Sequence, residues 1–278
     1  MGALLALLSS ISWGSADFLA GELSRRRAAV AVAGASQIVG FVVMLLALLV
    51  TAEWAADVPA ADYVVWGVLA SVAGLGGLIA FYTALSTGRM GVVSPIAALG
   101  VLVPLGVGLL RGEAPTGLQV LGIVVAVAGV VLASGPEVSG KVGARPVILA
   151  VVAAVAFGLF AVFLAAGSEA STILTMTVQR TTSATLAIVA AVVAGSIGGL
   201  QRADLPQLGV IGVLDVGANL LFGFATTLGL LSVVSVLGSL YPVVTVLLAW
   251  AVLKERLLPA QYVGVAAALV GVALIAGG

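Results

Sequence analysis

One half of this 278-residue chain repeats the other, and this repetition limits the possible folds more than any other feature. The spacing Glu-x5-Gln-x2-Gly-x6-Gly runs from Glu113 to Gly129 and returns, 142 positions later, from Glu255 to Gly271. A match that extends over two helices and a loop indicates two copies of one unit, residues 1–138 and 139–278. Duplicated apolar units are typical of membrane transporters.

The composition places both copies in a lipid bilayer. Apolar residues make up 62% of the chain and charged residues 8%, whereas soluble domains carry about 25% charged residues. The net charge is zero, so nothing indicates a nucleic-acid partner. Cysteine and histidine are absent, which excludes disulfides and thiol nucleophiles and removes nearly all zinc chemistry. We therefore expect no metal, no cofactor and no enzymatic activity.

Ten apolar stretches are long enough to cross a bilayer as helices, which takes about 20 residues each. They are 3–23, 28–51, 62–86, 92–110, 117–135, 146–167, 171–195, 206–230, 233–252 and 260–277. The sequence thus predicts an all-α integral membrane protein with ten transmembrane helices, five per copy. Because five is odd, the second copy crosses in the opposite sense, giving a 5+5 inverted repeat.

The loop charges predict an orientation. Loops that follow odd-numbered helices hold nine of the 11 Lys and Arg residues, whereas the even-numbered loops hold only Arg111. Under the positive-inside rule the odd loops face the cytoplasm and both termini lie outside. We expect a multi-pass protein of a bacterial-type plasma membrane, the inner membrane of the cell.

Short recognisable motifs follow one another along the chain, and some of them occur in both copies. They are Trp13-Gly14-Ser15, the junction Gly88-x5-Ser94-Pro95, the helix ends Leu110-Arg111-Gly112-Glu113 and Leu253-Lys254-Glu255, and the glycine spacing described above. Together they resemble the EamA-type drug/metabolite transporter superfamily, over essentially the whole chain. This resemblance implies ten helices, a central cavity, export or exchange of small metabolites, and a monomer or homodimer. It also implies cytoplasmic termini, whereas the loop charges place them outside.

Residues that differ between the copies are the candidates for a substrate site. Asp215 lies near the middle of the eighth predicted helix, and its counterpart is Gly74, so the shared scaffold requires no carboxylate there. An ionised carboxylate at this depth costs at least about 2.5–3.5 kcal/mol unless it is paired or hydrated. Asn219 follows four residues later on the same helical face. Together they are suited to bind a cation, an amine or a proton.

Arg180, near the centre of the seventh predicted helix, is the expected partner of Asp215. Asp17 and Trp13 share a face of the first helix because they lie four residues apart. Asp17 either anchors on the arginines at 25–27 or acts as a second carboxylate of the site. The alternative for Arg180 and Asp215 is a structural pair that only joins their two helices.

Tyr241 is the remaining candidate. It precedes Pro242, which interrupts the ninth predicted helix, and breaks of this kind can line substrate sites. Aromatic residues in apolar helices also serve packing or interface belts, so both roles stay open for Tyr241.

Residues that both copies share are expected to serve the scaffold. Gly122 and Gly129 lie two helical turns apart on one face, as do their counterparts, and small faces let helices approach closely in lipid. Glu113 and Glu255 are each expected to stabilise the start of the helix that follows them.

These features predict a secondary transporter of small metabolites such as amino acids. It would act as an exporter or exchanger by alternating access, with protonation of Asp215 as a means of coupling. Uptake of a sugar or other nutrient by the same fold is the main alternative. A lipid-modifying enzyme would need ionisable side chains converging at the interface, and none converge in the sequence. A structural or channel-like protein would tolerate apolar replacement of Asp215 and Arg180 together.

Overall fold

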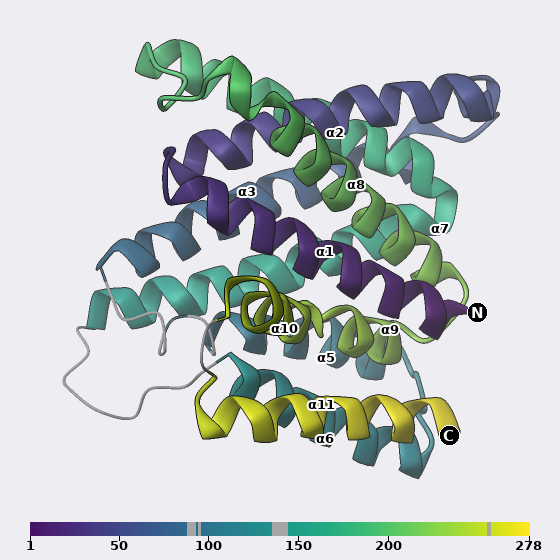
Figure 1. Ribbon diagram of the computed structural model, residues 1–278. Coiled ribbons are helices and arrows are strands. Elements are labelled where there is room, and N and C mark those ends of the chain that lie inside the picture. The colour runs from purple at the N-terminus through teal and green to yellow at the C-terminus, as the bar shows by residue number, and fades with distance from the viewer. Residues whose placement is uncertain (88–92, 94–95, 135–143, 255–256) are drawn as a thin grey trace.

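The computed structural model spans residues 1–278 and describes residues 1–87, 93, 96–134, 144–254 and 257–278. All regular elements within these residues are helices (Figure 1). The predicted Gly88-x5-Ser94-Pro95 junction falls largely outside the described residues, as does Glu255.

Helices follow one another along the whole chain with short connections. The first half contains α1 Gly2–Ser24, α2 Ala29–Thr51, η1 Glu53–Ala55, η2 Ala60–Asp62, α3 Val64–Thr87, η3 Leu99–Val101, α5 Leu102–Leu110 and α6 Gly117–Ala133. The second half contains α7 Ala144–Ala194, η4 Arg202–Asp204, α8 Leu205–Thr227, α9 Leu231–Gly238, α10 Tyr241–Leu253 and α11 Pro259–Gly277.

The helix α7 is two helices joined at Ser171. Its 51 residues would extend over about 76 Å if straight, more than twice the roughly 30 Å of a hydrocarbon core. Ser171 has extended backbone angles (φ −162°, ψ 120°), and its hydroxyl accepts a hydrogen bond from Leu174 N at 3.1 Å, as in a helix N-cap. The break lies where the sixth and seventh predicted helices meet.

Contacts with α3 show that the two arms of α7 run in opposite directions. Toward the end of α3, Gly77 lies against Phe157 of the first arm, and Gly74 lies against Phe160. Near its start, Gly67 lies against Thr175 of the second arm. The first arm is therefore antiparallel to α3, because its residue numbers fall as those of α3 rise. Four residues further along α3, Ser71 contacts Ser183. The residue numbers of the second arm therefore rise with those of α3, so this arm is parallel to α3.

An all-helical membrane protein is confirmed. In the described part of the chain, seven helices are long and apolar enough to cross a membrane, counting α7 once and α9 with α10 together as Leu231–Leu253, and two shorter apolar helices cover Ile96–Leu110 and Gly117–Ala133. The ninth predicted helix is divided into α9 and α10, just before Tyr241. The count of ten spans and the inverted repeat remain predictions.

Loops predicted to share a side of the membrane lie together. After α1, Arg27 forms an ion pair with Asp204 before α8 at 2.7 Å. Three even-numbered loops meet through other contacts: Arg111 pairs with Glu169 at 3.1 Å, and the Ser171 hydroxyl donates a hydrogen bond to Glu53. This grouping is what an alternating path through the bilayer requires.

Helices α6 and α11 are in direct contact through their glycine faces, side by side in Figure 1. A Cβ on Gly122 would meet the backbone of Gly271, and a Cβ on Gly129 would meet that of Gly264. In the repeat, Gly122 corresponds to Gly264 and Gly129 to Gly271, so exchanging the two copies converts one contact into the other. A two-fold symmetric contact has this property. The glycines therefore serve the scaffold as expected, since only residues without a Cβ allow this approach.

The expectation for Glu113 is wrong in its choice of helix. The start of α6 is capped by Thr116, whose hydroxyl accepts from Gln119 N at 3.2 Å. The Glu113 carboxylate instead accepts hydrogen bonds from Leu231 N at 2.6 Å and Ser232 N at 2.8 Å, at the start of α9. The reason is tertiary, because α5 packs against α9 in the other half of the chain.

Candidate functional site

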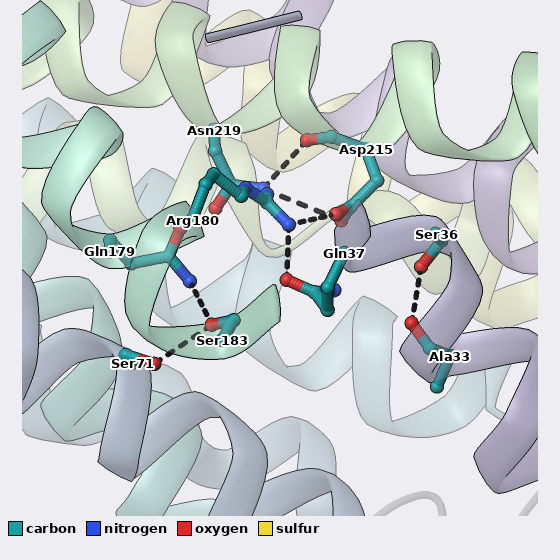
Figure 2. A network of polar contacts seen from close by, with 9 residues as sticks. All are labelled: Ala33, Ser36, Gln37, Ser71, Gln179, Arg180, Ser183, Asp215 and Asn219. Carbon is teal, nitrogen blue, oxygen red and sulfur yellow. Dashed lines mark hydrogen bonds and ion pairs between the residues drawn. The ribbon is translucent and has the colours of Figure 1, made fainter. Parts of the chain in front are cut away.

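An ion pair between α7 and α8 is at the centre of the candidate site (Figure 2). Arg180 Nη1 lies 2.8 Å from Asp215 Oδ2, and the same nitrogen donates a hydrogen bond to Gln37 Oε1 of α2 at 2.5 Å. Gly40 lies beside the guanidinium, where a Cβ would come within 3.2 Å of Arg180 Cδ. Three helices therefore hold the guanidinium, and the glycine leaves it room.

Asn219 extends the site by one turn of α8. Its Nδ2 donates to the backbone oxygen of Asp215 at 2.6 Å and lies 3.4 Å from Asp215 Oδ1. The shared face expected for these two residues is present.

A neutral polar chain continues from the pair toward α3. Gln179 Nε2 donates to Ser183 Oγ at 3.1 Å, and Ser183 Oγ lies 2.8 Å from Ser71 Oγ (Figure 2). All three side chains are buried. Hydrogen bonding of this kind joins helices in lipid, where no water is present to replace a lost partner.

The burial of the pair is unequal, and several of its neighbours keep unused hydrogen-bonding capacity. The Arg180 side chain is 2% exposed and that of Asp215 is 24% exposed. Arg180 Nε, Gln179 Oε1 and Asn219 Oδ1 are buried without a hydrogen-bond partner among the described residues. Buried polar atoms normally find a partner, so this cluster marks a place for water or a polar ligand.

Aromatic rings and a second carboxylate adjoin the pair. Trp13 of α1 contacts Phe222 of α8 with ring centroids 5.6 Å apart, and Tyr241 of α10 edge-on at 6.4 Å. Asp17, one turn after Trp13, is close enough to both Asp215 and Tyr241 to interact with them electrostatically. The Asp17 side chain is exposed rather than packed, and it forms no hydrogen bond or ion pair with a described residue.

The structure brings all six predicted residues into one region between α1, α7, α8 and α10. Asp17 sits with the site rather than with the arginines after α1, two of which have other partners: Arg25 contacts Glu22 and Arg27 contacts Asp204. The substrate role of the six residues remains a proposal.

Sequence reasoning missed the second partner of Arg180 and one wall of the site. Gln37 is the second partner of Arg180, and a glutamine at membrane depth is itself a signal that could have found it. Phe222 forms the wall beside Trp13, and no local pattern in the sequence distinguishes it from a packing residue. Ser71 and Ser183 carried no signal, because serine is common in apolar helices.

Chemically, the site offers a guanidinium, two carboxylates and aromatic faces within an apolar bundle. The described residues contain no cluster of three or more carboxylates that could hold a metal ion. A bundle of apolar helices with ionisable groups inside it defines a polytopic membrane protein with an intramembrane polar site. Such sites mark pathways for solutes or ions.

The sequence matches the EamA-like transporter family over residues 1–135 and 144–277. The chain therefore belongs to the EamA-like transporter family, whose members are membrane transporters of small solutes and not enzymes. A solved structure titled only "Crystal structure of protein" is similar with a TM-score of 0.81 at 18% identity, over 98% of this chain and 95% of that chain. That similarity supports the fold alone. No curated protein matches the chain.

Proposed function

We propose that this transporter is a secondary exporter or exchanger of small metabolites that carry an amino group, amino acids among them, in the plasma membrane. The observation that carries the proposal is the charge of the site. Arg180 pairs with one carboxylate, Asp215, and a second carboxyl group, Asp17, lies close enough to Asp215 to interact with it, so the site holds one carboxyl group more than it holds cations. A cationic group or a proton offsets that excess.

The arrangement suits a zwitterion. Arg180 Nε is buried and unpartnered, so it can donate to a solute carboxylate in addition to the bond from Nη1. Asp17 and Asp215 can accept from an ammonium group on the other side. The rings of Trp13 and Tyr241 provide faces for an apolar side chain or for the ammonium itself.

Competition for Arg180 provides a transport step. When a solute carboxylate binds Arg180 Nε and then takes Nη1 as well, Asp215 loses its partner and becomes available to the solute ammonium or to a proton. The bond that joins α7 and α8 is weakened by the same event, so the solute favours a different arrangement of these helices. Rocking of residues 1–138 against residues 139–278 as inverted halves would then expose the site to either side in turn.

Transport by purified protein in liposomes tests the proposal. The assay measures uptake and efflux of a pooled panel of amino acids, amines and sugars, with and without a pH gradient. We expect movement of amino compounds that Asp215→Asn abolishes and that Asp62→Asn, the same change at an exposed loop position, leaves intact. Gradient-driven movement supports proton coupling, and movement without gradient dependence supports exchange. If Asp215→Asn transports normally with unchanged pH dependence, the proposed site is wrong.

A further inference from the structure

A second cavity, broadly open at the surface and lined by both polar and apolar residues, lies away from the central pair, where α7 bends. Its volume is about 330 Å³, within the range of small-molecule sites. The walls that matter here are Glu53 after α2, Ser168, Ser171 and Thr172 around the bend of α7, and Phe224 and Thr227 at the end of α8. The contacts of Glu53 and of Arg111 with this region place it on the predicted outer side.

Glu53 brings an uncompensated carboxylate to this cavity. One of its oxygens, Oε2, accepts the Ser171 hydroxyl, which fixes the side chain at the bend. Its other oxygen has no partner among the described residues, and no described Lys or Arg lines the cavity. The cavity therefore presents a negative charge with a free acceptor.

Ser168 supplies the independent sign of a ligand. Ser168 lines the cavity and is 3% exposed, and its Oγ, which lies toward Gly223 of α8, is covered and has no hydrogen-bond partner in the described part of the chain, so a ligand meets it once the hydroxyl turns into the cavity. Leaving a buried hydroxyl unpaired costs about 1–3 kcal/mol, so a partner from outside the protein is expected there. Thr172 and Thr227 place two further hydroxyls around the same space.

The cavity and the central site both use residues of α8. Thr227, Gly223, Asn219 and Asp215 recur every four residues and so lie on one face of the helix. At Gly223 the helix comes close to Ser168 and Thr172, where a Cβ would collide with both side chains. This contact lies one turn of α8 from Asn219 and about 12 Å along the helix axis from Asp215.

We propose that this cavity is an outer binding site for the ammonium group of an organic amine. An ammonium has three donors, which match the free Glu53 oxygen and the hydroxyls of Ser168 and Thr227. Phe224, exposed at the cavity wall, gives the organic part of the ligand an apolar contact. The volume favours an organic solute over a bare metal ion. The role of the cavity as a stage on the way to Asp215 rests on the proposed function, whereas amine binding does not.

Calorimetric titration of the full-length protein in detergent tests the site with three probes that share a ring. Phenethylamine has only the ammonium, 3-phenylpropionate only the carboxylate, and phenylalanine both. The titrations use a background with the central charges removed, Asp17→Asn, Arg180→Gln and Asp215→Asn. We expect this triple variant to bind phenethylamine and not 3-phenylpropionate.

Adding Glu53→Gln is expected to weaken phenethylamine binding about tenfold, since a charged hydrogen bond is lost while the acceptor for Ser171 is kept. Adding Glu169→Gln instead removes an exposed carboxylate on the same side and is expected to change nothing. Ser168→Ala is the second variant, expected to weaken binding with unchanged thermal stability because it breaks no bond within the protein.

If Glu53→Gln and Glu169→Gln weaken phenethylamine binding equally, the effect is one of general surface charge and the proposal is overturned. Glu53-dependent binding of sodium ions without binding of phenethylamine would make the cavity an ion site and overturn it as well. If amine binding depends on Glu53 but liposomes show no transport, the outer site stands and the proposed function fails. If liposomes show transport but no amine binding depends on Glu53, the proposed function stands and the outer site fails.

Discussion

Arg180 and Asp215 form an ion pair of 2.8 Å between α7 and α8, with the arginine 2% exposed and the aspartate 24% exposed. The two charged groups are therefore unequally buried, and water can reach the carboxylate more easily than the guanidinium. This difference decides what happens when either partner is removed.

Removing Asp215 should cost more stability than removing Arg180. Asp215→Asn leaves a buried guanidinium without its counter-charge, whereas Arg180→Gln leaves a carboxylate that can be hydrated or take a proton. Breaking a buried pair costs about 3–5 kcal/mol, and we expect Asp215→Asn near the upper end and Arg180→Gln near the lower end. Thermal unfolding of the purified variants in detergent measures the difference.

The double variant Arg180→Gln with Asp215→Asn separates a structural pair from a working one. We expect it to recover most of the lost stability, because no charge remains buried, and to remain inactive in liposomes. A stable and active double variant would support the structural or channel-like alternative.

Glu113 should hold the start of α9 in place. Its carboxylate accepts from Leu231 N and Ser232 N, and hydrogen bonds to charged groups contribute about 1.5–3 kcal/mol each. We expect Glu113→Ala to lower thermal stability and to speed hydrogen exchange at the amides of residues 231 and 232. The matched change Glu22→Ala removes a carboxylate whose partner Arg25 is exposed, and should leave exchange there unaltered. Unchanged exchange in Glu113→Ala would mean that the cap contributes nothing.

The sequence predicted those features that follow from the cost of polar groups in lipid. A carboxylate at Asp215 requires a counter-charge, and Arg180 was the cation at matching depth in the neighbouring helix, so their contact could be predicted. The periodic small face in each copy predicted close helix contacts for α6 and α11, although it did not predict that these two helices contact each other.

Other features depend on tertiary packing that no local pattern encodes. The carboxylate of Glu113 reaches a helix 118 residues away rather than the one that follows it. The cavity beside Glu53 lies where Ser171 interrupts α7 and directs its hydroxyl at a distant loop. In the sequence, Glu53 was one of several loop carboxylates.

The topology predicts which loops share a side, and the absence of native cysteine makes the test direct. Four exposed positions are replaced singly: Arg26→Cys, Ser196→Cys, Asp57→Cys and Glu169→Cys. Given cytoplasmic odd-numbered loops, a membrane-impermeant maleimide should label the last two in intact cells and the first two only after lysis. The opposite pattern would reverse the orientation and keep the grouping. Labelling of Arg26→Cys and Ser196→Cys from different sides would contradict the alternating path.

The close contact of α6 and α11 should tolerate no added methyl group. A Cβ on Gly264 would meet the backbone of Ala133, which cannot turn aside as a side chain can. We expect Gly264→Ala to destabilise the protein by about 1–3 kcal/mol, the usual cost of overpacking. Gly76→Ala places the same methyl group within α3 where no atom lies within 4 Å, and should be neutral or stabilise by about 0.5–1 kcal/mol through helix propensity. Thermal unfolding of both variants in detergent measures the difference. Equal melting temperatures would show that α6 and α11 can separate without loss of stability. The glycine face would then not be what joins the two halves.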